Sequence, residues 1–221
     1  MPKEPFNIDL AIELITKEVE HFPKAGLFEL AQEGFNSPFQ LLVACIISIR
    51  TLDEVMLPTA RQLFAYAGTP DKVSRLSQTE IDHLIKTCTF HERKAEQILQ
   101  ISQKIMTEYN GNLPCKPEIL LSFNGVGPKC ANLVMGIVTG EAKIAVDTHV
   151  HRITNRWDYV KTSNPEKTFL PLEEKSPKKY WIEINRVLVP FGKNICGANR
   201  PKCLSCPINN MCPKIDVKFS S

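Results

Sequence analysis

The chain has 221 residues, of which 43% are hydrophobic and 23% are charged, and its formal net charge is +3. This composition is typical of an ordinary globular protein and excludes a disordered or low-complexity chain. The longest apolar run, residues 41–49, is too short to span a bilayer, so no membrane partner is expected. The small positive charge permits a polyanionic partner without requiring one.

The hydrophobic residues recur mostly at helical spacing. Apolar residues from Ile8 to Val19 stand four, three and four residues apart, which predicts an amphipathic helix. Ser37 and Pro38 are typical of a helix start, and the helix that follows should run through residue 49. Further helical patterns cover residues 57–67, 78–87, 92–109, 117–123, 128–139 and 178–189.

Strand signals are weak by comparison. Residues 143–146 form the only short β-branched run, and residues 161–176 have the composition of a polar linker. The chain is therefore predicted to be all-α, with a loop-rich module at its end. Its first residues carry no apolar signal core, so we expect it to stay where it is made, in the cytoplasm or nucleoid.

Eight cysteines in such a compartment are expected to be reduced thiols or metal ligands rather than disulfides. Four of them crowd near the end of the chain in the pattern C-x6-C-x2-C-x5-C: Cys196, Cys203, Cys206 and Cys212. Structural zinc usually takes two Cys-x2-Cys pairs, and only one occurs in this cluster. The uneven spacing therefore favours a [4Fe-4S] cluster over zinc, with disulfides as a third alternative.

A Gly-x-Gly turn separates two apolar helices within residues 120–131. Gly125 and Gly127 allow another backbone to approach closely, and Val126 should point inward between the helices. The second helix then begins with unpaired N–H groups, which suit a phosphate. This pattern predicts a helix–hairpin–helix that grips a nucleic-acid backbone without reading bases, and a plain helix–helix turn is the alternative.

Lys129 lies in the first turn of that second helix, where acidic residues are usually preferred. The positive end of the helix dipole disfavours a charged ammonium group there. A neutral amine is a nucleophile that can form a Schiff base with a sugar carbon. A lysine that only binds phosphate is the alternative interpretation.

Asp147 follows the apolar residues 144–146 and is expected to cap a new helix. A carboxylate held by backbone N–H groups stays ionised, and an ionised carboxylate can stabilise a cationic sugar intermediate. Capping and catalysis are therefore compatible at this residue. His149 and His151 have no second set of ligands nearby and are expected to be structural.

Three motifs occur in order between about residues 37 and 212: Gly-Val-Gly-x-Lys, Val-Asp-Thr-His-x-x-Arg and the four-cysteine pattern. Together they resemble the endonuclease III family of DNA glycosylase/AP lyases, within the helix–hairpin–helix glycosylase superfamily. The resemblance implies an all-α fold of two lobes. A six-helix barrel would cover residues 31–141, with its hairpin at about 117–139. A [4Fe-4S] lobe would combine residues 1–30 with 142–221.

The resemblance also implies an activity and the residues that perform it. A monomer would act on double-stranded DNA, removing damaged bases, oxidised pyrimidines above all, and cutting 3′ to the abasic site by β-elimination. Lys129 matches the nucleophile and Asp147 the catalytic carboxylate. The residues that match the phosphate-gripping hairpin are Gly125, Val126 and Gly127. The cysteines match the cluster ligands, and the cluster would shape a basic loop whose candidate phosphate contacts are Lys193, Arg200 and Lys202.

Three positions concern the way DNA would be read. Arg50 stands where the family usually has a glutamine that fills the gap left by a flipped base. It could fill this gap and favour an opposite base such as guanine, or it could only pair with Asp53 or a phosphate. Asp53 matches an acidic residue at the mouth of the family's pocket. Phe90 aligns with an apolar wedge that enters the base stack, although a lone Phe before a helix is more often part of a core.

Two other functions compete with this interpretation. A monofunctional glycosylase for mismatched or alkylated bases typically lacks the hairpin lysine, and its adenine-mismatch branch has a carboxylic acid at the position of Cys45. A non-catalytic DNA-binding iron–sulfur protein would not need both Lys129 and Asp147. The residues present therefore favour the bifunctional lyase.

Overall fold

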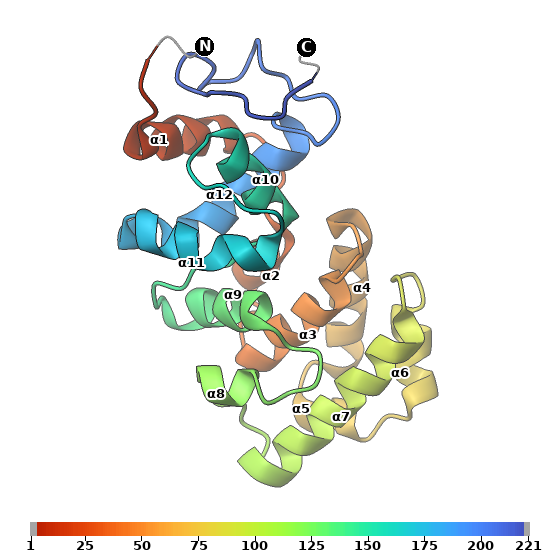
Figure 1. The fold of residues 1–221 in the computed structure, drawn as a ribbon. Helices are drawn as coiled ribbons and strands as arrows, with labels where there is room; N and C mark the ends of the chain where they lie inside the picture. The colour runs from red at the N-terminus through yellow and green to blue at the C-terminus, as the bar shows by residue number, and fades with distance from the viewer. Residues whose placement is uncertain (1–3, 219–221) are drawn as a thin grey trace. The chain divides into compact units, whose positions relative to one another are not determined.

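The computed structural model describes residues 4–218, and all regular secondary structure in this range is helical (Figure 1). The all-α prediction is confirmed. Residues 1–3 and 219–221, the ends of the predicted cluster lobe, lie outside the described range. The chain divides into two compact units, one made of residues 26–141 and the other of residues 1–25 and 142–221. No helix in the described part of the chain is both long and apolar enough to cross a membrane.

The first unit, residues 26–141, contains eight of the described helices. They are α2 (Gly26–Gln32), α3 (Pro38–Ser48), α4 (Asp53–Ala67), α5 (Pro70–Ser74), α6 (Gln78–Ile85), α7 (His91–Tyr109), α8 (Pro117–Leu120) and α9 (Pro128–Thr139). The pattern at residues 57–67 placed the start of α4 too late, and the pattern at 117–123 extended α8 too far. The short helices α2 and α5 were not predicted.

Helix α3 forms the centre of the first unit. It begins as expected, because the Ser37 side chain accepts a hydrogen bond from the Gln40 N–H and the Gln40 side chain reaches back to Ser37. Every residue from Leu41 to Ile47 has no exposed surface. A helix that is apolar on all sides must be surrounded by others, and α3 contacts α2, α4, α7 and α9.

A disulfide joins α3 to α9 through Cys45 and Cys130, with the Cα atoms 6.0 Å apart. The expectation that every cysteine is a reduced thiol or a metal ligand is therefore wrong for this pair. The two cysteines are separated by 85 positions along the sequence, and only the packing of α3 against α9 brings them together. Both side chains lie in the core, where the bond is shielded from water.

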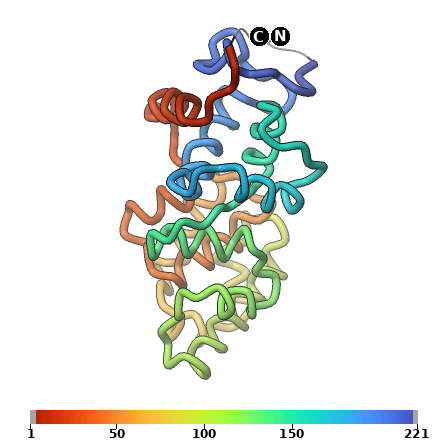
Figure 2. Tube along the Cα trace, turned by 60° about the vertical axis from the view of Figure 1, so that its left-hand side comes forward, coloured from red at the N-terminus to blue at the C-terminus, as the bar shows by residue number. Residues whose placement is uncertain are grey.

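The second unit combines the N-terminal helix with the C-terminal part of the chain. Its helices are α1 (Ile8–Val19), α10 (Thr148–Arg156), α11 (Pro165–Lys175) and α12 (Trp181–Asn194), with a 3-10 turn at Lys178–Tyr180. Figure 2 shows α1 in red beside the blue end of the chain, and α1 contacts α12. Trp157 and Phe191 are among the largest side chains buried in this core.

Residues 161–176 do not form the polar linker that their composition predicts. Helix α11 occupies most of this segment, and the Asn164 side chain caps it by accepting a hydrogen bond from the Lys167 N–H at 2.8 Å. Leu172 has no exposed surface and anchors the helix in the core of the second unit. Phe169 also packs against this core, so a few apolar contacts outweigh the charged composition of the segment. Residues 143–146 form no strand, and Ile144, Ala145 and Val146 are buried.

We predict that the Cys45–Cys130 bond stabilises the first unit. A cross-link that closes a loop of this length typically raises the free energy of unfolding by about 2–4 kcal/mol, because it restricts the unfolded chain. Urea unfolding of the wild-type protein should therefore shift to lower denaturant when a thiol reductant is added. The double variant Cys45→Ala/Cys130→Ala controls for reductant acting on other cysteines and should show no such shift. An unchanged wild-type midpoint would contradict the prediction.

Candidate functional site

The hairpin between α8 and α9 is built around Gly125. Its φ of +75° is a conformation that L side chains rarely adopt. A Cβ atom there would stand 2.7 Å from the Gln97 side-chain nitrogen. That nitrogen donates a hydrogen bond to the Asn124 carbonyl at 2.6 Å, so α7 holds the turn from one side. Val126 is buried as predicted, whereas a Cβ on Gly127 would meet no atom within 4 Å.

Helix α9 begins without a side-chain cap, because its N-cap residue is Gly127. The first N–H groups of α9 are therefore available to an outside acceptor such as a phosphate oxygen. Lys129 is the second residue of this helix and is half-buried. Within residues 4–218 its side chain takes part in no hydrogen bond or ion pair, which leaves the amine available to a ligand.

Asp147 is the N-cap of α10, as the sequence predicts. Its Oδ1 atom accepts a hydrogen bond from the Val150 N–H at 2.8 Å. The carboxylate is half-buried, and its second oxygen has no partner among the described residues. Lys129 belongs to the first unit and Asp147 to the second.

His149 is the second residue of α10, and neighbouring side chains and backbone hold its ring in place. Burial is the main factor that lowers its pKa, so the ring is neutral at neutral pH. Arg152 approaches its Nδ1 atom at 3.1 Å, and a Cβ on Gly192 would collide with the ring at 2.5 Å. His151 makes a 2.7 Å hydrogen bond with Thr168. Both histidines thus make contacts within the second unit, and their structural role stays a prediction.

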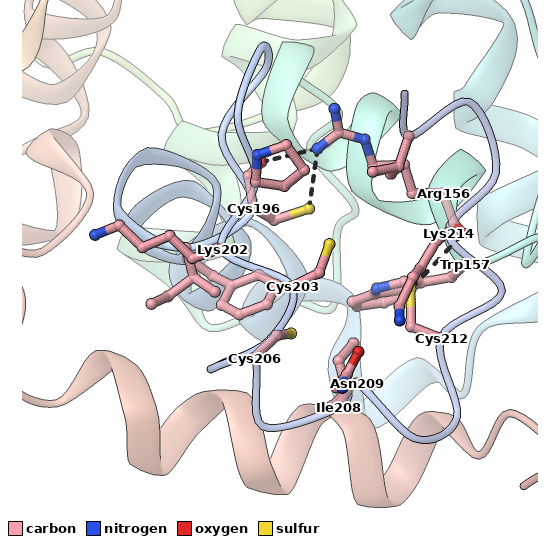
Figure 3. A pocket seen from close by; sticks show the side chains of 14 residues that line it. Arg156, Trp157, Cys196, Lys202, Cys203, Cys206, Ile208, Asn209, Cys212 and Lys214 are labelled. Carbon is pink, nitrogen blue, oxygen red and sulfur yellow. Dashed lines mark hydrogen bonds between the residues drawn. The ribbon is translucent and has the colours of Figure 1, made fainter. Parts of the chain in front are cut away.

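The four clustered cysteines line one pocket in the second unit, with an empty volume of about 340 Å³ (Figure 3). Burial raises the pKa of Cys206 to about 12 and that of Cys212 to about 11. These thiols therefore ionise only when a bound cation or cluster compensates for their lost hydration. Among the described residues, no three His, Cys, Asp or Glu side chains stand close enough to hold a single metal ion.

Helix α10 also holds the loop that contains the first of these cysteines. The Arg156 guanidinium donates hydrogen bonds to the Cys196 sulfur at 3.2 Å and to the Gly197 and Ala198 carbonyls, both at 2.7 Å. Arg152 donates to the Cys196 carbonyl at 3.0 Å. Sequence reasoning missed this role, although two arginines four positions apart on one helix face were a usable signal.

The predicted phosphate contacts Lys193, Arg200 and Lys202 are all exposed. Lys193 lies in the last turn of α12, and the other two flank Pro201 in the cysteine loop. Lys202 also lines the cysteine pocket. These cations are therefore accessible to a polyanion, but the contacts themselves stay a prediction.

Arg50 and Phe90 meet in the first unit, with the guanidinium 5.8 Å from the centre of the ring. Phe90 is 54% exposed, so it is no core residue. Arg50 makes no ion pair with Asp53, which instead accepts a hydrogen bond from the Gly26 N–H at 3.2 Å. The role of Arg50, in the gap of a flipped base or on a phosphate, stays a prediction.

Lys94 is a residue that sequence reasoning missed. It is 4% exposed, and its ammonium donates to the carbonyls of Ile47 at 2.8 Å and Ile49 at 2.7 Å and to the Thr51 hydroxyl at 3.0 Å. These acceptors lie where α3 ends, so Lys94 fixes the backbone that carries Arg50. Burial lowers the pKa of Lys94.

Comparison with known proteins identifies a matching family. Residues 43–178 match the family profile described as HhH-GPD superfamily base excision DNA repair protein. Endonuclease III of Thermotoga maritima is 36% identical to this chain over 90% of the chain and 91% of that protein. Endonuclease III of Haemophilus influenzae is 32% identical, covering 94% of this chain and 97% of that protein.

Solved structures show the same similarity. A non-covalent complex of endonuclease III with DNA superposes with a TM-score of 0.82 at 26% identity, covering 94% of each chain. A trapped covalent intermediate of endonuclease III with DNA gives a TM-score of 0.80, also at 26% identity. A thermostable thymine-DNA glycosylase, at 20% identity and a TM-score of 0.77, shares the fold.

We predict that Lys94→Met lowers the free energy of unfolding by about 2–4 kcal/mol. The apolar side chain would leave the buried Ile47 carbonyl and the part-buried Ile49 carbonyl without this donor. Loss of a buried partner costs about 1–3 kcal/mol. Urea unfolding followed by circular dichroism measures the effect. Lys86→Met is the matched control, because Lys86 is exposed and should change stability by less than about 0.5 kcal/mol. Equal effects of the two substitutions would refute the role given to Lys94.

Proposed function

Because this chain belongs to the endonuclease III family of the HhH-GPD superfamily, we propose that its bifunctional DNA glycosylase/AP lyase activity depends on Lys129 and Asp147. The protein is an enzyme of base excision repair, as the family assignment and the endonuclease III–DNA structures support. The observation on which the residue assignment rests is the unpartnered amine at an uncapped helix start, directly after a glycine hairpin.

Lys129 is the proposed nucleophile. Its Nζ atom attacks C1′ of the damaged nucleotide, and the bond from C1′ to the base breaks as the base departs. Opening of the sugar ring then leaves a protein–DNA Schiff base. Removal of a proton from C2′ expels the 3′ phosphate, which breaks the strand, and water releases the lysine. The uncapped N–H groups of α9 are well suited to hold a backbone phosphate during these steps.

Asp147 is the proposed electrostatic partner of the reaction. Positive charge develops on the sugar as the base departs, and an ionised carboxylate stabilises that charge. The cap hydrogen bond to the Val150 N–H fixes one carboxylate oxygen and leaves the other for the sugar. A rigid helix start thus positions the charge before the substrate binds.

DNA is the partner that the structural neighbours support, since both endonuclease III structures are DNA complexes. We extend this to duplexes with damaged bases, oxidised pyrimidines above all, or with abasic sites, bound by a monomer in the cytoplasm or nucleoid. The hairpin would grip the backbone, and Lys193, Arg200 and Lys202 would contact phosphates.

The [4Fe-4S] cluster is the cofactor that we propose for the four-cysteine pocket. Structural zinc usually takes two Cys-x2-Cys pairs, and the pattern C-x6-C-x2-C-x5-C contains only one. A cubane cluster needs one thiolate for each of four separate irons, which suits four thiols spaced around a pocket. When bound, the cluster would supply structural support, and Arg152 and Arg156 orient the loop for it.

Borohydride reduction on a duplex with one abasic site tests the role of Lys129. The wild-type protein should become covalently attached to DNA, because borohydride reduces the Schiff base to a stable amine. Lys129→Gln should lower the yield of adduct by roughly a hundredfold or more. Lys116→Gln, which removes an exposed lysine near α8, should leave the yield unchanged. Undiminished trapping by Lys129→Gln would assign the Schiff base to another amine.

Asp147→Asn isolates the charge of this residue, since asparagine also caps helices well. Single-turnover excision of an oxidised pyrimidine should slow by about a hundredfold or more, with little change in the melting temperature. Asp147→Ala should additionally lower stability by about 1 kcal/mol through loss of the cap. If Asp147→Asn keeps the wild-type excision rate, the carboxylate has only a capping role.

Removing a cluster ligand tests the cofactor. We expect Cys206→Ser to lower bound iron and acid-labile sulfide and to destabilise the second unit, because the pocket loses one of its four thiols. Cys115→Ser, a free cysteine outside the pocket, should retain both. Metal and sulfide analysis of the purified wild-type protein checks the assignment, and bound zinc without sulfide would overturn it.

A further inference from the structure

Asn124 and Gly125 form the tip of the hairpin between α8 and α9. The Val126 N–H donates a hydrogen bond to the Phe123 carbonyl at 3.1 Å, so Asn124 and Gly125 are the central residues of a tight turn. The φ of +75° at the second central position favours glycine there. Both central residues are exposed. The hairpin therefore presents an Asn-Gly pair to solvent.

An Asn-Gly pair is able to modify itself. The backbone nitrogen of the glycine attacks the side-chain amide carbon of the asparagine, which closes a succinimide ring and releases ammonia. Water then opens the ring at either of its carbonyl groups and leaves aspartate or isoaspartate. Glycine is the most permissive second residue, because no side chain shields its nitrogen. The rate then depends on how readily the glycine N–H gives up its proton.

The Gly125 N–H is available for this reaction. It donates no hydrogen bond within residues 4–218. Its peptide group includes the Asn124 carbonyl, whose oxygen accepts a 2.6 Å hydrogen bond from the Gln97 side chain. Loss of the proton places negative charge on that oxygen, and a hydrogen bond to the charged form favours ionisation. A depression of about 350 Å³ that these three residues help to line gives water access to the same peptide.

The chain contains a second Asn-Gly pair whose surroundings differ. Asn110 and Gly111 follow the end of α7, and Asn110 is exposed like Asn124. The Gly111 N–H donates a hydrogen bond to the Ile105 carbonyl at 3.1 Å, and this bond must break before the nitrogen can attack. Within the described residues, no donor contacts the Asn110 carbonyl. The same dipeptide is therefore protected at the end of α7 and unprotected in the hairpin.

We propose that Asn124 converts spontaneously to aspartate and isoaspartate in the folded protein, and that the conversion weakens the grip of the hairpin on DNA. A bond forms between the Gly125 nitrogen and Cγ of Asn124 as the bond from Cγ to Nδ2 breaks. The proton from the Gly125 nitrogen passes through water to the departing ammonia. A second water molecule then hydrolyses the ring, so the sequence needs no oxidant or reductant.

The effect on DNA rests on the function proposed above, whereas the chemical conversion does not. Either product places a carboxylate beside the hairpin residues that would grip a phosphate, and two negative charges at this distance repel each other. Isoaspartate also adds one methylene group to the backbone of the turn. Both changes oppose phosphate binding, and the repulsion weakens as salt screens it.

Peptide mapping of the folded wild-type protein tests the conversion. After storage in mildly alkaline buffer, digestion after Glu108 and Glu118 places the two Asn-Gly pairs on separate peptides. The Asn124 peptide should gain about 1 Da and yield an isoaspartate form. The Asn110 peptide should convert about fivefold more slowly, the factor that an average protein hydrogen bond supplies. In urea, where the Gly111 hydrogen bond is lost, both should convert at similar rates. An unmodified Asn124, or equal rates in the folded protein, would overturn the proposal.

Asn124→Asp carries the charge of the product and tests the effect on DNA. Its affinity for a duplex with a stable abasic-site analogue should fall by about fivefold at low salt and recover as salt is added. Asn110→Asp adds the same charge at the other pair and should keep the wild-type affinity. Fluorescence anisotropy measures both, and an unchanged affinity of Asn124→Asp would refute the effect on DNA. The mass measurement uses no DNA, so it is independent of the lyase chemistry, which the absence of a wild-type borohydride adduct would refute.

Discussion

The packing of α3 against α9 is the constraint on which the first unit depends. The Cys45–Cys130 disulfide makes this contact covalent. Lys129 directly precedes one of these cysteines, and the chain reaches Arg50 just after α3 ends. One core contact therefore helps to set the position of the proposed nucleophile and of Arg50. Reactive and reading groups on rigid elements keep the geometry that positioning requires.

In the second unit, the single helix α10 positions both Asp147 and the cysteine loop. Asp147 caps the start of α10, while Arg152 and Arg156 further along bind the loop of Cys196. A disturbance of the cysteine pocket can therefore reach the carboxylate through one rigid element of about two turns. Under the proposed function, a cluster in this pocket would therefore support Asp147 structurally through α10.

Charged side chains divide into two kinds in this structure. Lys94 and Arg156 hold backbone carbonyls and so shape the loops around them. The Lys129 amine and one oxygen of Asp147 make no hydrogen bond or ion pair within the described residues. Both groups can therefore bond to a substrate, as the proposed function requires.

The sequence alone determined the features that are local. These features are the helix starts at Ser37 and Asp147, the hairpin glycine and the four-cysteine pattern. Each depends on residues that are close in the sequence, so their spacing is enough to predict them. Tertiary structure alone decided the rest. The disulfide, the Lys94 contacts and the meeting of Arg50 with Phe90 join residues about forty or more positions apart. Helix α11 forms in a polar segment because the Leu172 side chain is buried in the core of the second unit. Such contacts depend on which helices pack together, and no local pattern encodes that choice.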